Sequence, residues 1–303
     1  MTDRILARTL EGAIWSAVGR VAQTALSLLS VAVIAQVLTP QTYGLFGAAM
    51  LLIALTEVIT GGTLTQSLIQ RKALDQQHID ATFWLNSLLS LAAAGFLVAL
   101  ATPLLALVNA PEALAALYCL AILTVLNGVA AVPQALLMRG MNFRRSMQID
   151  TVSTALASLT GIGLALGGAG IWALILMESV RVAVRTFMLL TGTDWTITGV
   201  GSRKALRELL AFNLSSLATV SLARIEQLLP RMLVATLLGP QALGLWLLAR
   251  RVLDETQRLS AVPLTAVTMT AIARLQDEPA RVKRVVLGLY QASSLFPCRC
   301  MPG

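Results

Sequence analysis

The chain has 303 residues, of which 56% are hydrophobic and 13% charged, with a mean hydropathy of +0.76. Soluble domains carry about 25% charged residues, so this composition excludes a soluble globular domain and indicates a polytopic membrane protein. The formal net charge is +8. Since Lys and Arg gather in the cytoplasmic loops of membrane proteins, we expect no nucleic-acid partner.

Apolar segments long enough to cross a bilayer, about 20 residues each, predict an all-α membrane helix bundle. Eight of them are complete, and a ninth begins near residue 284. The predicted helices cover 13–38, 43–69, 83–108, 113–138, 149–168, 171–191, 208–238 and 243–274. The first eight residues lead straight into a full-length apolar segment, so we expect a first span there and no removed signal peptide.

The connecting loops alternate in charge. Turns near 39–42, 109–112, 168–170 and 239–242 contain no Lys or Arg. The intervening loops carry Arg4 and Arg8, Arg71 and Lys72, Arg139, Arg144 and Arg145, Arg203, Lys204 and Arg207, and Arg274, Arg281, Lys283 and Arg284. The positive-inside rule places the basic loops and the N-terminus in the cytoplasm. We therefore expect a multi-pass protein of the bacterial cytoplasmic (inner) membrane.

A short Pro/Gly turn occurs twice. The sequence LTPQTYGLF at 38–46 returns as LGPQALGLW at 238–246, a period of 200 residues. Such a period suits a transporter built from two multi-helix halves. We predict a six-helix first lobe at 1–191, a cytoplasmic linker at 192–207 and an incomplete second lobe at 208–303. The tail 295–303 is atypical, since Pro297 would break the ninth helix, so a truncated, non-transporting remnant stays an alternative.

Arginine side chains inside the predicted spans are the strongest functional signal. An Arg at the centre of a span costs about 2.5–3.5 kcal/mol on insertion scales, so it usually faces a cavity or a partner. At about 1.5 Å per residue, three of these arginines lie near the middle of the membrane and two lie nearer its outer side. Each shares a helix stripe with other polar residues. The substrate-binding candidates are Arg20, Gln23, Arg224, Arg231, Arg250 and Arg258.

Acidic residues in the same spans offer partners for some of these bases. Glu57 is a partner for Arg20, and the i, i+4 spacings pair Arg250 with Asp254 and Arg251 with Glu255. Ion pairing alone is therefore an open alternative to substrate binding. A positive excess remains even if every pair forms, and it requires an anion. Arg binds phosphate through a planar fork, and Glu57, Asp254 and Glu255 are candidates for ion coupling.

Enzyme and metal signatures are missing from the sequence. It contains no G-x-x-x-x-G-K-[ST] stretch for ATP and no G-x-S-x-G elbow. The single histidine, His78, has no Cys or carboxylate cluster that would make a metal site. We predict no enzyme activity, no metal and no cofactor. A glycan polymerase or ligase would need a long outer loop for its catalytic groups, and the outer turns are short.

Several motifs, in order along the chain, resemble those of a known family. They are SLIQR at 67–71, TFWLN at 82–86, VPQALLMR at 132–139, MNFRR at 141–145, GAGIWAL at 168–174, LGP at 238–240 and RLQD at 274–277. The chain resembles bacterial lipopolysaccharide/exopolysaccharide transporters of the colanic-acid exporter branch, in the multidrug/oligosaccharidyl-lipid/polysaccharide superfamily. The resemblance covers essentially 10–290.

This resemblance implies two six-helix lobes around a central cationic cavity. It implies that an undecaprenyl-pyrophosphate-linked oligosaccharide moves from the inner to the outer leaflet, for surface polysaccharide biosynthesis, with membrane lipid and the polymerase and export machinery as partners. Family members carry 12 to 14 helices, more than this chain holds. A drug/cation antiporter of the same superfamily is the alternative, but it would carry buried acids in excess.

Overall fold

A computed structural model describes residues 2–60, 65, 68–69, 75–140, 142–192, 195–196, 199 and 222–254. In the first helix, side chains are described at Gly19 and from Val21 onward. Every regular element in these ranges is helical, which confirms the predicted all-α class. The predicted ninth helix lies outside the described residues, as do 208–221 and 255–274.

The helices follow one another through short connections. They are α1 (Thr2–Val37), α2 (Pro40–Thr60), α4 (Gln76–Ala99), α5 (Ala101–Leu107), the 3-10 turn η1 (Pro111–Ala113), α6 (Leu114–Arg139), α7 (Phe143–Leu166), α8 (Ile171–Thr191) and the helical segment Leu222–Asp254. Four described segments are long and apolar enough to cross a membrane: Gln76–Ala99, Pro111–Arg139, Phe143–Leu166 and Leu222–Asp254.

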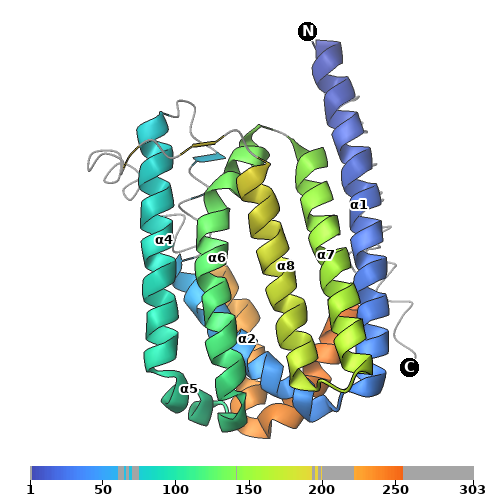
Figure 1. The fold of residues 1–303 in the computed structure, drawn as a ribbon, viewed down its shortest axis with the longest axis vertical. Coiled ribbons are helices and arrows are strands. Elements are labelled where there is room, and N and C mark those ends of the chain that lie inside the picture. The colour runs from blue at the N-terminus through green and yellow to red at the C-terminus, as the bar shows by residue number, and fades with distance from the viewer. Residues whose placement is uncertain are drawn as a thin grey trace, which may run out of the picture.

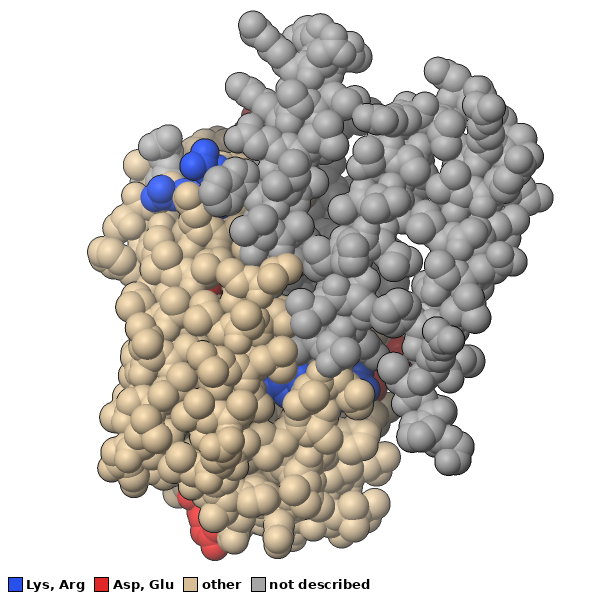
Figure 2. Space-filling model, turned by 90° about the vertical axis from the view of Figure 1, so that its right-hand side faces the viewer, with Lys and Arg blue, Asp and Glu red and all other residues tan. Residues whose placement is uncertain are grey.

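The bundle has two layers in Figure 1. Helices α4, α6, α8, α7 and α1 stand side by side in front, and α2 and Leu222–Asp254 (orange) cross behind them. The α1–α2, α5–α6 and α7–α8 connections all lie at the lower end. The turns without Lys or Arg therefore gather at one end of the bundle. Figure 2 shows a broad described surface with charged atoms in only a few places, as a lipid-facing surface requires.

Two predicted boundaries were wrong for identifiable reasons. The expected helix at 83–108 begins earlier, at Gln76, and is interrupted at Leu100, where α5 takes over. Pro103 has no N–H to donate to the carbonyl four residues before it, so the helix is broken there. The expected helix at 149–168 begins at Phe143, where the Asn142 side chain caps it by accepting a hydrogen bond from the Arg145 backbone N–H (3.3 Å).

The predicted outer turn at 239–242 appears as a bend inside Leu222–Asp254. Gly239 has φ +78°, a left-handed conformation that glycine adopts without the steric penalty of a Cβ. In Figure 1 the orange ribbon descends behind α6, turns at the foot of the molecule and rises again toward α7. The segment therefore makes a helical hairpin, as predicted, although its hydrogen-bonded turns run on across the bend.

The two copies of the repeated turn pack directly against each other. A Cβ on Gly44 would lie 1.6 Å from the carbonyl oxygen of Pro240, and a Cβ on Gly244 would lie 1.8 Å from that of Pro40. The contact is reciprocal, because each glycine receives the proline carbonyl of the other copy. We call this contact the glycine seam. It places the 200-residue repeat on a pseudo-twofold arrangement of α2 and Leu222–Asp254.

Small side chains let the core helices approach closely. Ala48 and Ala49 of α2 and Ala235 of Leu222–Asp254 are fully buried in one cluster with Leu117 and Leu120 of α6. Lipid tails are as apolar as leucine, so close packing of small residues drives helix association in membranes. This core holds α2 and the Leu222–Asp254 hairpin behind the front layer. Both elements also line a cavity.

Candidate functional site

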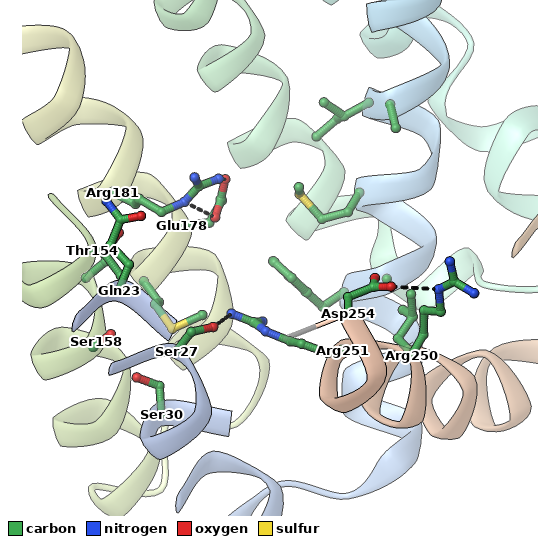
Figure 3. Close-up of a pocket in the computed structure, with 18 of the residues that line it drawn as sticks. Gln23, Ser27, Ser30, Thr154, Ser158, Glu178, Arg181, Arg250, Arg251 and Asp254 are labelled. Carbon is green, nitrogen blue, oxygen red and sulfur yellow. Dashed lines mark hydrogen bonds and ion pairs between the residues drawn. The ribbon is translucent and has the colours of Figure 1, made fainter. Parts of the chain in front are cut away.

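A cavity of about 1000 Å³ lies between the two layers. Five elements line it: α1, α2, α7, α8 and Leu222–Asp254. The first lobe supplies four of these elements, and the fifth comes from the region that the sequence assigns to the second lobe. Figure 3 shows polar side chains from α1, α7 and α8 on one side and from Leu222–Asp254 on the other. The cavity is therefore a polar space inside an apolar bundle.

Four carboxylates line the cavity, and each has an arginine partner. Asp150 of α7 pairs with Arg185 of α8 (3.1 Å), and Asp254 pairs with Arg250 (3.0 Å). Glu57 of α2 pairs with Arg224 at 2.9 Å. Glu178 of α8 takes a two-pronged contact from Arg181, whose Nε donates to Oε2 at 2.9 Å. These four pairs cancel their own charge.

Two further arginines on the cavity have no acid partner among the described residues. They are Arg231 and Arg251, both on Leu222–Asp254. Arg251 reaches across to α1, where its Nη2 donates to the Ser27 hydroxyl at 3.2 Å. Both side chains are partly buried. Arginine stays charged even when desolvated, so the described part of the cavity has a positive excess.

The structure brings most of the predicted site residues together. Gln23, Glu57, Arg231, Arg250 and Asp254 all line the cavity. Gln23 donates to the Thr151 hydroxyl of α7 at 3.4 Å. The side chain of Arg20, and Glu255 and Arg258 entirely, lie outside the described residues.

The described partner of Glu57 is a residue that the sequence did not suggest for it, and the side chain of Arg20 lies outside the described residues. The sequence suggested Arg20 by depth, but the structure pairs Glu57 with Arg224, which is not part of the lining. The two residues are 167 positions apart in the chain. Depth along a helix is readable from sequence, whereas the neighbour across a bundle depends on which helices are adjacent. The expected Arg250–Asp254 pair, by contrast, is present.

Sequence reasoning missed the charged face of α8. Arg181 and Arg185 lie near the predicted cytoplasmic end of their helix, where they read as residues that snorkel to the interface. Instead both line the cavity, together with Glu178 and Asp150. The spacing of Glu178, Arg181 and Arg185 places all three on one helix face, and that was the available signal. Within the described residues, no group of three or more His, Cys, Asp or Glu side chains is placed to hold a metal ion.

The fold and the cavity together define a multi-pass membrane helix bundle with a polar interior. Among solved structures, the chain is similar to a multidrug resistance MATE family transporter of the MOP superfamily in an inward-facing conformation, with a TM-score of 0.59. The match covers 91% of this chain and 70% of that one at 16% identity, a level that shows the shared fold alone. The chain belongs to the family described as polysaccharide biosynthesis protein, whose model matches residues 33–301.

Two curated relatives support the same assignment. The chain is 27% identical over 304 residues to the succinoglycan biosynthesis transport protein ExoT of Rhizobium meliloti (strain 1021), covering 100% of this chain and 62% of ExoT. It is 26% identical over 297 residues to the lipopolysaccharide biosynthesis protein WzxC of Escherichia coli (strain K12), covering 91% of this chain and 56% of WzxC. The chain thus spans about three fifths of the length of these relatives.

Proposed function

We propose that this chain forms the substrate cavity of a flippase that moves an undecaprenyl-pyrophosphate-linked oligosaccharide across the bacterial inner membrane. The pyrophosphate binds the arginines, the sugars occupy the polar cavity, and the polyprenyl tail stays in the lipid. Movement of one lobe against the other then exposes the cavity to the opposite side. The N-terminus and the basic loops face the cytoplasm.

The observation that carries this proposal is the pair of arginines without an acid partner in the described cavity. Arg231 and Arg251 lie on the two arms of the Leu222–Asp254 hairpin, and among the described residues the four neighbouring ion pairs leave their charge uncompensated. A diphosphate carries negative charge and several acceptor oxygens, which suit two guanidinium forks. We assign Arg231 and Arg251 the main contacts, with Gln23 and Arg250 extending the same site. Arg224, beside the lining, and Arg20 and Arg258, outside the described residues, are the further arginines that we propose from the sequence.

The charge balance disfavours a drug/cation antiporter, the alternative suggested by the fold. A site for organic cations requires an acid without a basic partner, and each carboxylate of the described lining has one. Coupling to an ion would instead use an acid whose partner is released during transport. Glu57 and Asp254, each in an ion pair on the cavity, are the described candidates, and Glu255 completes the set proposed from sequence.

The proposal is tested by binding and by transfer between leaflets. The purified chain is reconstituted in liposomes with undecaprenyl pyrophosphate bearing a fluorescent disaccharide, and an impermeant quencher reports the leaflet. Binding of unlabelled undecaprenyl pyrophosphate is followed by native mass spectrometry. Hydrogen bonds to charged groups contribute about 1.5–3 kcal/mol each, so Arg231→Ala and Arg251→Ala should each weaken binding roughly 10- to 100-fold.

Arg144→Ala is the matched control, because Arg144 is an exposed arginine at the start of α7 and is not part of the cavity lining. It should bind and transfer the lipid as the parent chain does. Equal binding by Arg231→Ala, Arg251→Ala and Arg144→Ala would remove the pyrophosphate role from the cavity. Binding without any transfer would show that the 303 residues hold the substrate site but do not move the lipid.

A further inference from the structure

One wall of the cavity is polar but almost uncharged. It is built from α1 and α7, which lie side by side along the edge of the bundle in Figure 1. We call it the hydroxyl wall, and its members are Gln23, Thr24, Ser27, Ser30, Ser153, Thr154 and Ser158. On α1 the spacing from Gln23 to Ser27 to Ser30 is four and then three residues, which places these side chains on one helix face.

Several hydroxyl protons of this wall are already engaged. Ser30 donates to the Leu26 carbonyl at 2.7 Å, Ser153 donates to the Asp150 carbonyl at 3.1 Å, and Thr154 donates to that carbonyl at 2.7 Å. A hydroxyl has one proton and two acceptor lone pairs. Each of these oxygens therefore has lone pairs left to offer a ligand but no proton, and this part of the wall accepts hydrogen bonds.

The hydroxyl wall adjoins the uncompensated positive charge. Arg251 extends from Leu222–Asp254 to donate to Ser27, which belongs to the wall. An anion held by Arg251 therefore lies next to α1. A group bonded to that anion is therefore within reach of the wall. For a lipid-linked oligosaccharide this group is the sugar attached to the pyrophosphate.

We propose that the hydroxyl wall binds this first sugar and selects an uncharged one. This inference rests on the proposed function. A neutral sugar presents hydroxyl protons that the wall oxygens accept. An acidic sugar would place a carboxylate close to Asp150 and against the hydroxyl oxygens of Ser30, Ser153 and Thr154, whose protons are engaged. No base lines the cavity from the described parts of α1 and α7, and Arg185, which reaches Asp150 from α8, is already paired.

Thr154 provides the sharpest test, because α7 contains its matched control. Thr154 and Thr160 are both half-buried, and each donates its hydroxyl proton to the carbonyl four residues earlier, at 2.7 and 2.9 Å respectively. Thr154 lines the cavity and Thr160 does not. Valine has the shape of threonine without the hydroxyl. Ser158→Ala is a second variant of the wall. It removes the hydroxyl group and adds no atoms that could clash.

The probes are undecaprenyl pyrophosphate that is bare, bears glucose, or bears glucuronic acid. The parent chain should bind the glucose probe about 10-fold more tightly than the glucuronic acid probe. Removing one neutral hydrogen bond weakens binding about 3- to 10-fold, so Thr154→Val and Ser158→Ala should weaken the glucose probe by that factor. Their binding of the bare probe should change less than 2-fold. Thr160→Val should match the parent for all three probes, and thermal unfolding confirms that each variant is folded.

The outcomes separate this inference from the proposed function. If the bare probe does not bind the parent chain, the pyrophosphate role fails. Methyl glucoside then tests the wall without any phosphate, and Thr154→Val but not Thr160→Val should weaken its binding at millimolar concentration. Equal affinity of the parent chain for the glucose and glucuronic acid probes would overturn the selectivity. Equal effects of Thr154→Val and Thr160→Val would overturn the placement of the sugar on the wall.

Discussion

Glu57 of α2 accepts a hydrogen bond from Arg224 of Leu222–Asp254 at 2.9 Å, and this ion pair joins the two predicted lobes beside the cavity. Both side chains are about 40% exposed, with 42% for Glu57 and 41% for Arg224. Water that reaches the pair screens it, so the net contribution of the ion pair to the stability of the fold is modest. Its position makes it a link that must break whenever α2 and Leu222–Asp254 separate at this level.

A double-mutant cycle measures this link. Glu57→Gln and Arg224→Gln should each lower the midpoint of thermal unfolding, and the double variant should lower it by less than the sum of the two. We expect a coupling energy of about 0.5–1 kcal/mol. Arg250→Gln with Glu57→Gln is the control combination, because Arg250 pairs with Asp254, and these two changes should add. Additive effects in the Glu57–Arg224 cycle would contradict the ion pair.

The glycine seam predicts a severe effect of one methyl group. In Gly44→Ala the added carbon would lie 1.6 Å from the Pro240 carbonyl oxygen, and backbone on both sides must shift. We expect destabilisation of at least about 1–3 kcal/mol and a seam that opens. A cysteine at Leu243, which is 1% exposed beside the seam, should then react with a maleimide in a variant whose other cysteines are replaced.

Gly163→Ala is the control for the seam, because a Cβ there meets nothing within 4 Å. It lies inside α7, where replacing glycine by alanine favours the helix by roughly 0.5–1 kcal/mol. The cysteine at position 243 should therefore stay protected in Gly163→Ala. Protection in Gly44→Ala as well would mean that the two turns tolerate a side chain between them.

Much of the fold could be predicted because its determinants are local. Apolar length marked the spans, basic residues marked one set of loops, and the turn before Gly44 and Gly244 marked the repeat. Half of the site could be predicted for the same reason, because Arg231 and Arg250 are charged side chains in apolar segments. The partner of Glu57 was not readable, because it depends on which helix crosses α2. The inward direction of Arg181 was hidden by its position near a helix end, where snorkelling is the ordinary expectation.

A second close contact lies between α4 and α6. The Asn86 side chain donates to the Gly128 carbonyl at 2.8 Å, and a Cβ on Gly128 would lie 2.0 Å from the Ser90 hydroxyl oxygen. Gly128→Ala should therefore cost about 1–3 kcal/mol of stability. Adding Ser90→Gly removes the clashing atoms and should recover part of the loss in thermal unfolding. Gly95→Ala in α4 is the control, because nothing lies within 4 Å of its Cβ position.

The orientation in the membrane is tested by labelling intact cells. The charge alternation predicts that the α6–α7 connection is cytoplasmic and that the α5–α6 connection is external. On a background without Cys119, Cys298 and Cys300, a cysteine at Glu112 should react with an impermeant maleimide from outside. A cysteine at Asn142 should react only after the cells are permeabilised. The reverse pattern would invert the topology.

The glycine seam also has a consequence for the order of synthesis. Its two halves are 200 residues apart in the chain, and ribosomes add about 5–20 residues per second. At that rate the Pro40–Gly44 turn is made about 10–40 s before its counterpart. During that interval α2 is held only by the first lobe, through its contacts with α4, α6 and α8. The newly made hairpin around Gly239 then packs against the Pro40–Gly44 turn, which is already in the bilayer.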